Sequence, residues 1–227
     1  MAAWPSSADE LVDVQRALGS AEPPPWRLGP GDAVGGCFVC SPRGKHGTGQ
    51  VGDLLWAAAA AAAEPAVVRG EAGAPYEAGL LALREGLALE AAVRRLDEPP
   101  DVLLVDATGR DHPRRAGLAL HLGAVLEVPT VGVTHRPLLA EGGWPDDLPA
   151  ARSPLTLGDE LVGYWVRTRP GTRPLAIHAA WRTDAATAVE VVLAALAGHR
   201  TPEPLRGARR AARAARARSE IMRVDVP

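Results

Sequence analysis

The stretch VLLVDATGRDHPRR, residues 102–115, decides how this sequence can fold. Four apolar residues run into Asp106 and a proline pair precedes them, so the run is predicted to be a short buried strand. Ligand sites in open α/β sheets cluster beyond the carboxyl ends of strands, which is where Asp106 falls. A carboxylate in that place is costly unless it is paired or ligated, although a role in capping the following turn would also explain it.

Outward from this strand, the sequence predicts further strands and helices. Upstream, three short runs joined by turns indicate an antiparallel meander, at 33–40, 54–62 and 66–73. The second run is ambiguous, because its alanines favour a helix while its length and flanking turns suit a buried strand. The remaining helices are expected at 79–96, 112–128 and 183–198, the remaining strands at 129–135, 161–168 and 174–181, and a loop at 138–149. This order predicts one mixed α/β sheet with helices packed on both of its faces.

The two ends of the chain carry different signals. Residues 7–18 are predicted to form a helix capped by Ser7, and a proline-rich linker follows. The basic segment 206–227 is expected to be either a helix or a disordered arm. As a helix it would place arginines 206, 209, 213 and 216 on one face, which suits a nucleic-acid backbone or, equally, solvent. We therefore expect one domain over residues 1–205, with its N-terminal helix and linker in 1–30, and a basic tail from 206.

Composition limits the classes of function. The 227 residues carry a net charge of only −2, so any affinity for nucleic acid has to come from local patches. Cys37 and Cys40 form a CxxC pair, but on a strand these positions face opposite sides, so we expect two reduced cysteines rather than a zinc or redox motif. No signal peptide or membrane span is expected, and the sequence predicts a cytoplasmic protein.

Glu85 is the second candidate for chemistry. In a helix its face is shared with Leu81, Ala88, Leu89 and Ala92, an apolar stripe that would turn the carboxylate toward the sheet. Two inward carboxylates, Asp106 and Glu85, are the usual way to hold a hard cation such as Mg²⁺. The alternative is a glutamate on the helix surface beside Arg84.

The segment RDHPRR offers a histidine and two cations beyond the strand. His112 could orient or deprotonate a water near a metal, and Arg114 and Arg115 could bind phosphate. A helix start with solvated charges would give the same pattern.

Longer motifs identify a family. The segments PYEAGLLALRE (75–85), VLLVDATGRDHPRRAGLALHLGAVLEVPTVGVTHRPL (102–138), RPLAIHAAWRT (173–183) and HRTPEPLR (199–206) resemble endonuclease V in order and spacing. The likeness covers residues about 70 to 206. It implies an RNase H-like fold and a Mg²⁺- or Mn²⁺-dependent phosphodiesterase in DNA repair. Such an enzyme nicks DNA, or in some members RNA, at the second phosphodiester 3′ to deoxyinosine or inosine.

The resemblance also implies roles for single residues. The metal carboxylates of the family fall on Glu85 and Asp106, and its histidine in HPRR falls on His112. The wedge that enters the duplex beside the lesion falls on Pro75, Tyr76 and Gly79. The family's DGHG turn is DATG here, with Gly109 at its end, and the lesion base would flip into a pocket near this turn. Gly109, Arg114 and Arg115 are the other expected nucleic-acid contacts.

Several positions depart from the family pattern. The first metal aspartate is replaced by Cys37; Asp32, on the opposite side of the strand, is a poor substitute, and Asp111 beside His112 could supply an alternative carboxylate. Thiolate is a soft ligand whereas Mg²⁺ prefers hard oxygens. His135 replaces the family's lysine and could stabilise a phosphate only when protonated. Ala78 replaces the second proline of the wedge, and Trp181 replaces the glycine of the GHR motif.

Two hypotheses follow from this pattern. The first is a monomeric, metal-dependent endonuclease that acts on inosine-containing strands, with Glu85 and Asp106 as metal ligands and His112 and His135 as assisting groups. The second is a catalytically impaired homologue that still binds nucleic acid, which the exchange at Cys37 favours.

Overall fold

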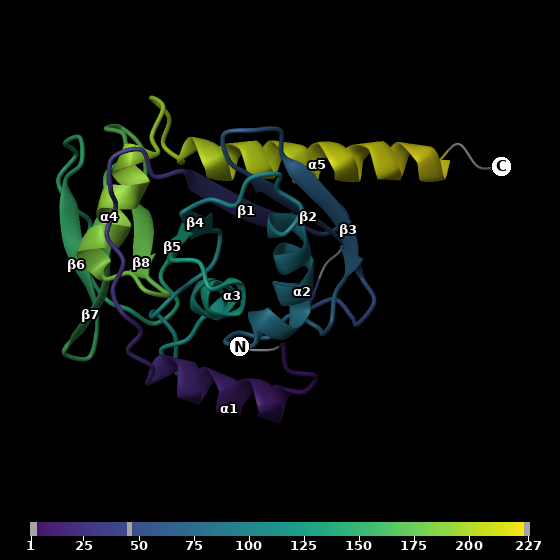
Figure 1. Ribbon diagram of the computed structural model, residues 1–227, viewed down its shortest axis with the longest axis horizontal. Helices are drawn as coiled ribbons and strands as arrows, with labels where there is room; N and C mark the ends of the chain where they lie inside the picture. Colours follow the sequence, from purple (N-terminus) through teal and green to yellow (C-terminus); the bar gives the residue numbers. More distant parts are fainter. Residues whose placement is uncertain (1–3, 45–46, 225–227) are drawn as a thin grey trace.

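A central eight-stranded sheet organises the residues that the structure, a computed structural model, describes: 4–44 and 47–224, with side chains as far as 219. Its order is β3-β2-β1-β4-β5-β8-β7-β6 (Figure 1). The strands are β1 (Val34–Cys40), β2 (Leu54–Ala60), β3 (Ala66–Glu71), β4 (Val102–Val105), β5 (Thr130–Thr134), β6 (Arg152–Leu157), β7 (Glu160–Val166) and β8 (Leu175–Ala179).

The pairing of the strands is mixed, as predicted. β1, β2 and β3 form the antiparallel meander, β4 and β5 continue from β1 in parallel, and β8, β7 and β6 close the sheet in antiparallel pairs. The parallel centre brings the carboxyl ends of β1, β4 and β5 to one edge. Cys37 pairs with Val105, so the residue that follows β4, Asp106, lies beside it.

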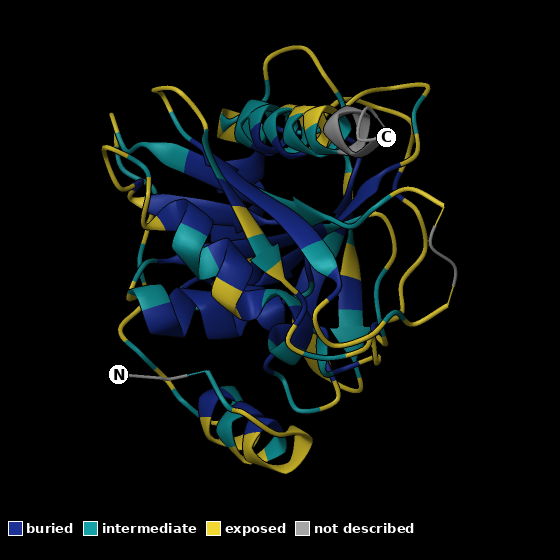
Figure 2. Ribbon diagram, turned by 90° about the vertical axis from the view of Figure 1, so that its right-hand side faces the viewer, coloured by how far each residue is buried: buried dark blue, intermediate teal, exposed yellow. Residues whose placement is uncertain are grey.

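Helices cover both faces of the sheet. The helices are α1 (Ala8–Gly19), α2 (Leu81–Val93), α3 (Leu118–Leu126), α4 (Ala185–Ala194) and α5 (Glu203–Val224). α2 and α3 pack on one face with α1 outside them, and α4 and α5 pack on the other (Figures 1 and 2). Cys37 belongs to the core under α2 while Cys40 contacts the core under α5, which confirms that the two cysteines face opposite sides of the strand.

The alanine run resolves as strand β2. It is central in the meander, paired on both sides, and its residues Ala57–Ala60 are buried under helices on both faces. Small side chains let α5 approach: a Cβ at Gly207 would lie 3.1 Å from the Cβ of Ala60. Tertiary packing therefore overrides the helical preference of alanine.

The basic segment is a helix that belongs to the domain. Leu205, Ala208 and Ala212 are fully buried against β1 and β2, and Trp56 Nε1 donates to the hydroxyl of Ser219 at 3.2 Å. The helix begins at Glu203, so the boundary expected between residues 205 and 206 falls inside α5. The arginine pattern suggested a tail because the alanines between the arginines, which form the buried stripe, are individually weak signals.

Two other elements differ from the prediction. β6 lies within 150–160, a segment for which no element was predicted; its Pro154 is tolerated because β6 is the edge strand of the sheet. The helix predicted from 112 begins only at Leu118. Residues 112–117 form a turn in which Arg115 has a φ of 56°, a conformation that interrupts a right-handed helix.

Candidate nucleic-acid site at the ends of the central strands

Asp106, Cys37 and Glu85 meet at the edge where β1 and β4 end. All three line one cavity of about 250 Å³, together with Tyr76 of the preceding loop. Glu85 comes from α2 and faces the sheet, whereas its neighbour Arg84 is buried elsewhere and pairs with Asp53 at 3.6 Å. The geometry therefore agrees with the prediction that the carboxylate of Glu85 points toward the sheet.

Arg209 of α5 also reaches this edge. Its Nη2 lies 3.0 Å from Oδ1 of Asp106, and the two side chains are only 16% and 22% exposed. The guanidinium also lies over the ring of Phe38, 5.5 Å from its centroid. Asp106 is thus held in a shielded ion pair with an arginine of the chain itself.

The protonation of the two neighbours follows from burial. Burial, with a smaller contribution from the negative charge of Asp106, raises the pKa of Glu85 to about 7, although Arg84 opposes the shift. Burial and Asp106 also raise the pKa of the Cys37 thiol far above its usual range, so it stays protonated at neutral pH.

These residues do not fit the Mg²⁺ or Mn²⁺ that the resemblance implies. Hard cations need several charged or carbonyl oxygens, but Cys37 offers a protonated sulfur and Asp106 is engaged by Arg209. Across residues 4–44 and 47–224, no cluster of three His, Cys, Asp or Glu side chains has the arrangement of a metal site.

The two alternative carboxylates have structural roles. Asp111 is fully buried and accepts backbone N–H groups from Leu138, Leu139 and Ala140 at 2.5 to 2.8 Å. Asp32 accepts the N–H of Gly29 at 2.6 Å within a turn. Neither replaces the missing aspartate, because each is used by the local backbone.

The expected wedge forms an exposed loop beside the cavity. Tyr76 is 50% exposed and its N–H donates to the carbonyl of Thr48 at 2.7 Å. Pro75 lies in the same loop and is exposed. Gly79 ends the loop with a φ of 83°, which a residue with a side chain adopts only under strain.

Three donors converge on the carbonyl oxygen of Gly79. They are Nε2 of Gln15 in α1, Nε2 of His112 and Nη2 of Arg114, each at 3.0 Å. Arg114 also donates from Nε to Oε1 of Gln15 at 2.7 Å. The loop is therefore clamped from α1 and from the HPRR turn.

His112 and Arg114 belong to this clamp, whereas Arg115 contacts the β6–β7 hairpin; their expected roles toward water and phosphate stay predictions. Nδ1 of His112 accepts the N–H of Arg114 at 3.2 Å, so Nε2 carries the proton that is donated to Gly79. Burial lowers the pKa of His112 to about 4, which keeps the ring neutral. Arg115 pairs with Glu160 at 2.7 Å and donates to Leu157. The contacts of His112 and Arg114 position the loop, and His112 also lines the cavity of about 300 Å³ beside it.

Gly109 is required for close packing, and its expected contact with nucleic acid stays a prediction. A Cβ at Gly109 would collide with the carbonyl oxygen of Ala179, and the N–H of Arg110 donates to that oxygen at 2.8 Å. The turn after β4 is thereby held against β8.

His135 lies among arginines on the far side of Asp106. Its Nδ1 accepts from Nη1 of Arg200 at 3.2 Å. Burial lowers the pKa of His135, and Arg200, Arg209 and Arg173 lower it further against the opposing effect of Asp106. His135 is therefore neutral at pH 7 and does not supply the positive charge of a lysine.

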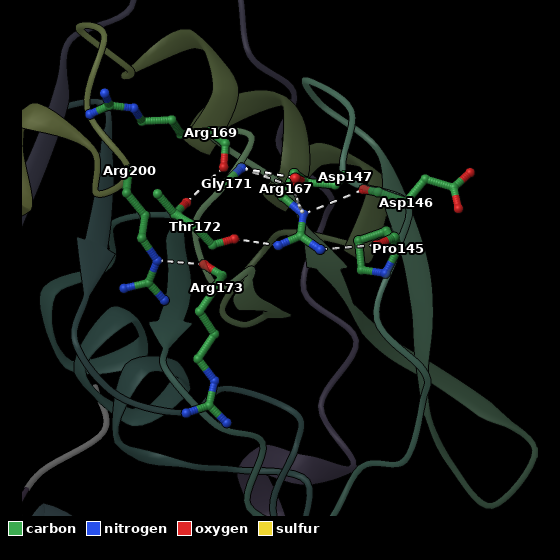
Figure 3. A network of polar contacts seen from close by, with 9 residues as sticks. All are labelled: Pro145, Asp146, Asp147, Arg167, Arg169, Gly171, Thr172, Arg173 and Arg200. Carbon is green, nitrogen blue, oxygen red and sulfur yellow. Dashed lines mark hydrogen bonds and ion pairs between the residues drawn. The ribbon is translucent and has the colours of Figure 1, made fainter.

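Arg173 and Arg200 are held by a polar network (Figure 3). Nη2 and Nε of Arg200 donate to the carbonyls of Pro174 and Arg173, and Arg167 binds the neighbouring loop through Asp147 and Pro145. Arg173 also lies 5.3 Å over the ring of Trp144. The sequence did not single out Arg173 or Arg200, because nothing local to either residue relates it to Asp106.

A second cavity of about 300 Å³ opens between the wedge and the end of β4. It is lined by Tyr76 and Gly79 on one side, by Ala107 and Thr108 in the middle, and by Leu138 beyond β5. Asp106 lines both cavities. Its surface is more apolar than polar, and polar side chains such as Gln15, Glu77 and Arg136 also line it, as in pockets that bind small molecules.

This combination of sheet order, helices on both faces and a carboxylate-bearing edge defines an RNase H-like nuclease fold. The sequence profile of endonuclease V matches residues 33–210, and the chain belongs to the endonuclease V family.

Individual relatives agree with this assignment. Endonuclease V of Streptomyces coelicolor is 36% identical over 220 residues, which cover 94% of this chain and 93% of that protein. The alignment with endonuclease V of Roseiflexus castenholzii is 38% identical and covers 63% of this chain and 64% of that protein. The crystal structure of endonuclease V from Streptomyces avermitilis superposes with a TM-score of 0.81 at 31% identity, over 97% of each chain.

Endonuclease V of Ciona intestinalis in complex with inosine-containing DNA shares the fold, with a TM-score of 0.76 at 20% identity over 92% of this chain and 97% of that one. None of the helices in the described part of the chain is long and apolar enough to cross a membrane.

Proposed function

We propose that this protein binds nucleic-acid strands that contain inosine, the deaminated form of adenosine, and that metal-dependent cleavage is strongly impaired. The cavity between Tyr76 and Thr108 carries the proposal, because it joins an exposed aromatic wedge to an apolar pocket at the strand edge. Membership of the endonuclease V family supports it, as does the inosine-containing DNA bound by the Ciona relative. In this role the protein would recognise lesions in DNA repair.

Different residues of the chain would carry out different parts of strand recognition. Tyr76 would stack in the gap that the displaced base leaves, since an aromatic ring stacks on bases of any sequence. The base would enter the pocket beside Ala107 and Thr108, where backbone groups can read its polar edge. Gly79, held by Gln15, His112 and Arg114, would keep the wedge at a fixed distance from that pocket.

A binding experiment tests the proposal. Fluorescent single and duplex DNA and RNA strands with one inosine are titrated against matched strands with guanosine or adenosine. We expect at least tenfold preference for inosine, and we expect Tyr76→Ala to remove most of the affinity. Leu87→Ala is the control, because Leu87 is 64% exposed on the outer face of α2. Equal affinity for all strands would contradict the proposal.

Metal-dependent nicking is the second candidate, because Glu85 and Asp106 still share one cavity. It predicts cleavage of the same strands with Mg²⁺ or Mn²⁺ that disappears in Asp106→Ala. If the wild type cleaved no more than Asp106→Ala but still bound the strands, the result would favour the impaired homologue.

A further inference from the structure

Arg209 lies where a cation would have to bind. Its Nη2 is 3.0 Å from Asp106, the carboxylate that the resemblance assigns to a metal, and the pair is largely shielded from water. In the described part of the chain, Arg209 has no other ion pair with a carboxylate. Its positive charge therefore neutralises Asp106 without any added ion.

The position of Arg209 is fixed by the fold. Ala208 and Ala212, on either side of it along α5, are fully buried against the sheet, and Leu205 is buried one turn earlier. Phe38 lies beneath the guanidinium and also contacts Arg213 at 5.5 Å. Because α5 is anchored in this way, it holds Arg209 next to Asp106. A side chain on a flexible surface segment would be free to move away.

Two more arginines face the same place. Arg200 donates from Nη1 to Nδ1 of His135 at 3.2 Å and from Nε to the carbonyl of Arg173, and the guanidinium of Arg173 lies 5.3 Å over the ring of Trp144. The interactions of the arginines with each other are repulsive, and no acidic partner of Arg173 or Arg200 occurs among the ion pairs of the described residues. A cluster of guanidinium groups near Asp106, which lines both cavities, suits the oxygen atoms of a phosphate diester.

We propose that Arg209 acts as a built-in cation: it keeps divalent metals off Asp106 and, with Arg173 and Arg200, binds a backbone phosphate without metal. The phosphate part rests on the proposed function, whereas the exclusion of metal does not. Restoring an aspartate at position 37 is then insufficient to rebuild a metal site, because Asp106 stays occupied until Arg209 is removed.

Manganese binding tests the exclusion directly. Mn²⁺ is titrated into the full chain and free Mn²⁺ is followed by electron paramagnetic resonance. We expect no site tighter than millimolar in the wild type, in Cys37→Asp or in Arg209→Lys. We expect one site at least tenfold tighter in the double variant Cys37→Asp/Arg209→Ala. Tight binding by the wild type or by Cys37→Asp alone would overturn the inference.

Two further variants keep this test decisive. Arg209→Ala alone preserves the buried Cys37 and still frees Glu85 and Asp106, so it should gain a weaker site even where Cys37→Asp does not fold. Arg210→Ala is the matched control, because Arg210 is exposed on the same helix and pairs with Glu203 at 2.8 Å. It should leave Mn²⁺ binding at the wild-type level, and a gain equal to that of Arg209→Ala would overturn the inference.

Strand binding tests the phosphate contact. With an inosine-containing strand in EDTA, wild-type affinity should stay within twofold of its value in Mn²⁺. Arg209→Ala should lose at least tenfold in EDTA and Arg210→Ala no more than twofold. Wild-type binding that requires metal would overturn the inference. Absence of any binding by the wild type would instead reject the proposed function, and the Mn²⁺ titration would still decide the role of Arg209 at Asp106.

Discussion

At the scale of single residues, Gly79 fixes the wedge in place. Its φ of 83° lies in the region that favours glycine, and its carbonyl accepts from Gln15, His112 and Arg114. An added Cβ would lie 3.3 Å from Nη2 of Arg114 and 3.4 Å from Nε2 of His112. Backbone strain and crowding therefore act together at this residue.

Gly79→Ala should destabilise the protein by about 1–2 kcal/mol, because the left-handed conformation is unfavourable for alanine. It should also weaken strand binding by displacing Tyr76. Urea unfolding measures the first effect and strand titration the second. Gly143→Ala serves as the control, since a Cβ there would meet nothing within 4 Å. Equal stability of the two variants would contradict this account of Gly79.

His112 gives a prediction for pH. Its pKa is lowered to about 4 by burial, whereas an ordinary histidine titrates at 6.5. The unfolded chain therefore binds more protons between pH 6.5 and 4, so His112 stabilises the fold fully above pH 6.5 and loses that contribution progressively as the pH falls toward 4. The loss should be on the order of 2 kcal/mol.

The measurement compares urea unfolding at pH 4.5 and 7 for the wild type and His112→Gln. The variant should be less stable at pH 7 but should lose less stability on acidification. His199→Gln, at an exposed position, should retain the full wild-type loss. If His112→Gln lost as much stability between pH 7 and 4.5 as the wild type does, groups other than His112 would control the acid response.

The candidate site could be predicted in part at this scale. Glu85 and Asp106 stand out because an inward carboxylate is unusual, and Cys37 stands out only against the family motif. The contact of Arg209 with Asp106 could not be predicted, because the arginine stripe at 206, 209, 213 and 216 does not indicate which arginine contacts which strand. His112, Arg114 and Arg115 looked free in the sequence because their partners, such as Gln15 and Glu160, are distant along the chain.

At the scale of elements, α5 and β2 form an interface of alanines. Ala208 and Ala212 of the helix are fully buried against the strand, and the close approach leaves no room for larger side chains. Such a contact depends on the fit of small residues more than on buried area.

Ala212→Leu should therefore destabilise the protein by about 1–3 kcal/mol through overpacking. It should also displace α5 and loosen the contact between Arg209 and Asp106. Ala214→Leu is the control, because Ala214 is exposed two residues further along the helix. Thermal and urea unfolding of both variants measure the difference, and an equal response would contradict the alanine interface.

The sequence predicted most elements but not all of their limits. Strands with β-branched runs, such as β4 and β5, were located to within a residue or two. β6 was missed because its proline is acceptable only at a sheet edge, and edge position is a property of the assembled sheet. The start of α3 was placed too early because the turn at 112–117 depends on tertiary contacts of its side chains.

At the scale of the whole molecule, charge is separated although the net charge is only −2. Arg209 pairs with Asp106 at the strand edge, Arg200 donates to the carbonyl of Arg173, and Arg213 continues along α5. Binding of a strand should therefore weaken with salt despite the overall negative charge.

Arg213→Ala should lower the slope of log Kd against log salt by about 0.7, the value for one phosphate contact of a single strand. Arg16→Ala should leave the slope unchanged, because Arg16 lies on α1, on the opposite side of the sheet, and pairs with Asp13. Titrations of both variants and the wild type at several salt concentrations measure these slopes. An unchanged slope in Arg213→Ala would remove α5 from the binding surface.

The clamp on Gly79 has a consequence for how this protein can change over evolutionary time. Gln15 belongs to α1, outside the 33–210 segment that the family profile matches, yet it holds the turn that ends the wedge. The segment that the family profile matches thus depends on a helix outside that segment for the position of its exposed loop. An exchange at Gln15 would therefore shift the proposed wedge while the sheet and its edge stay unchanged, so the specificity of strand binding can change through a residue that lies outside the strand edge.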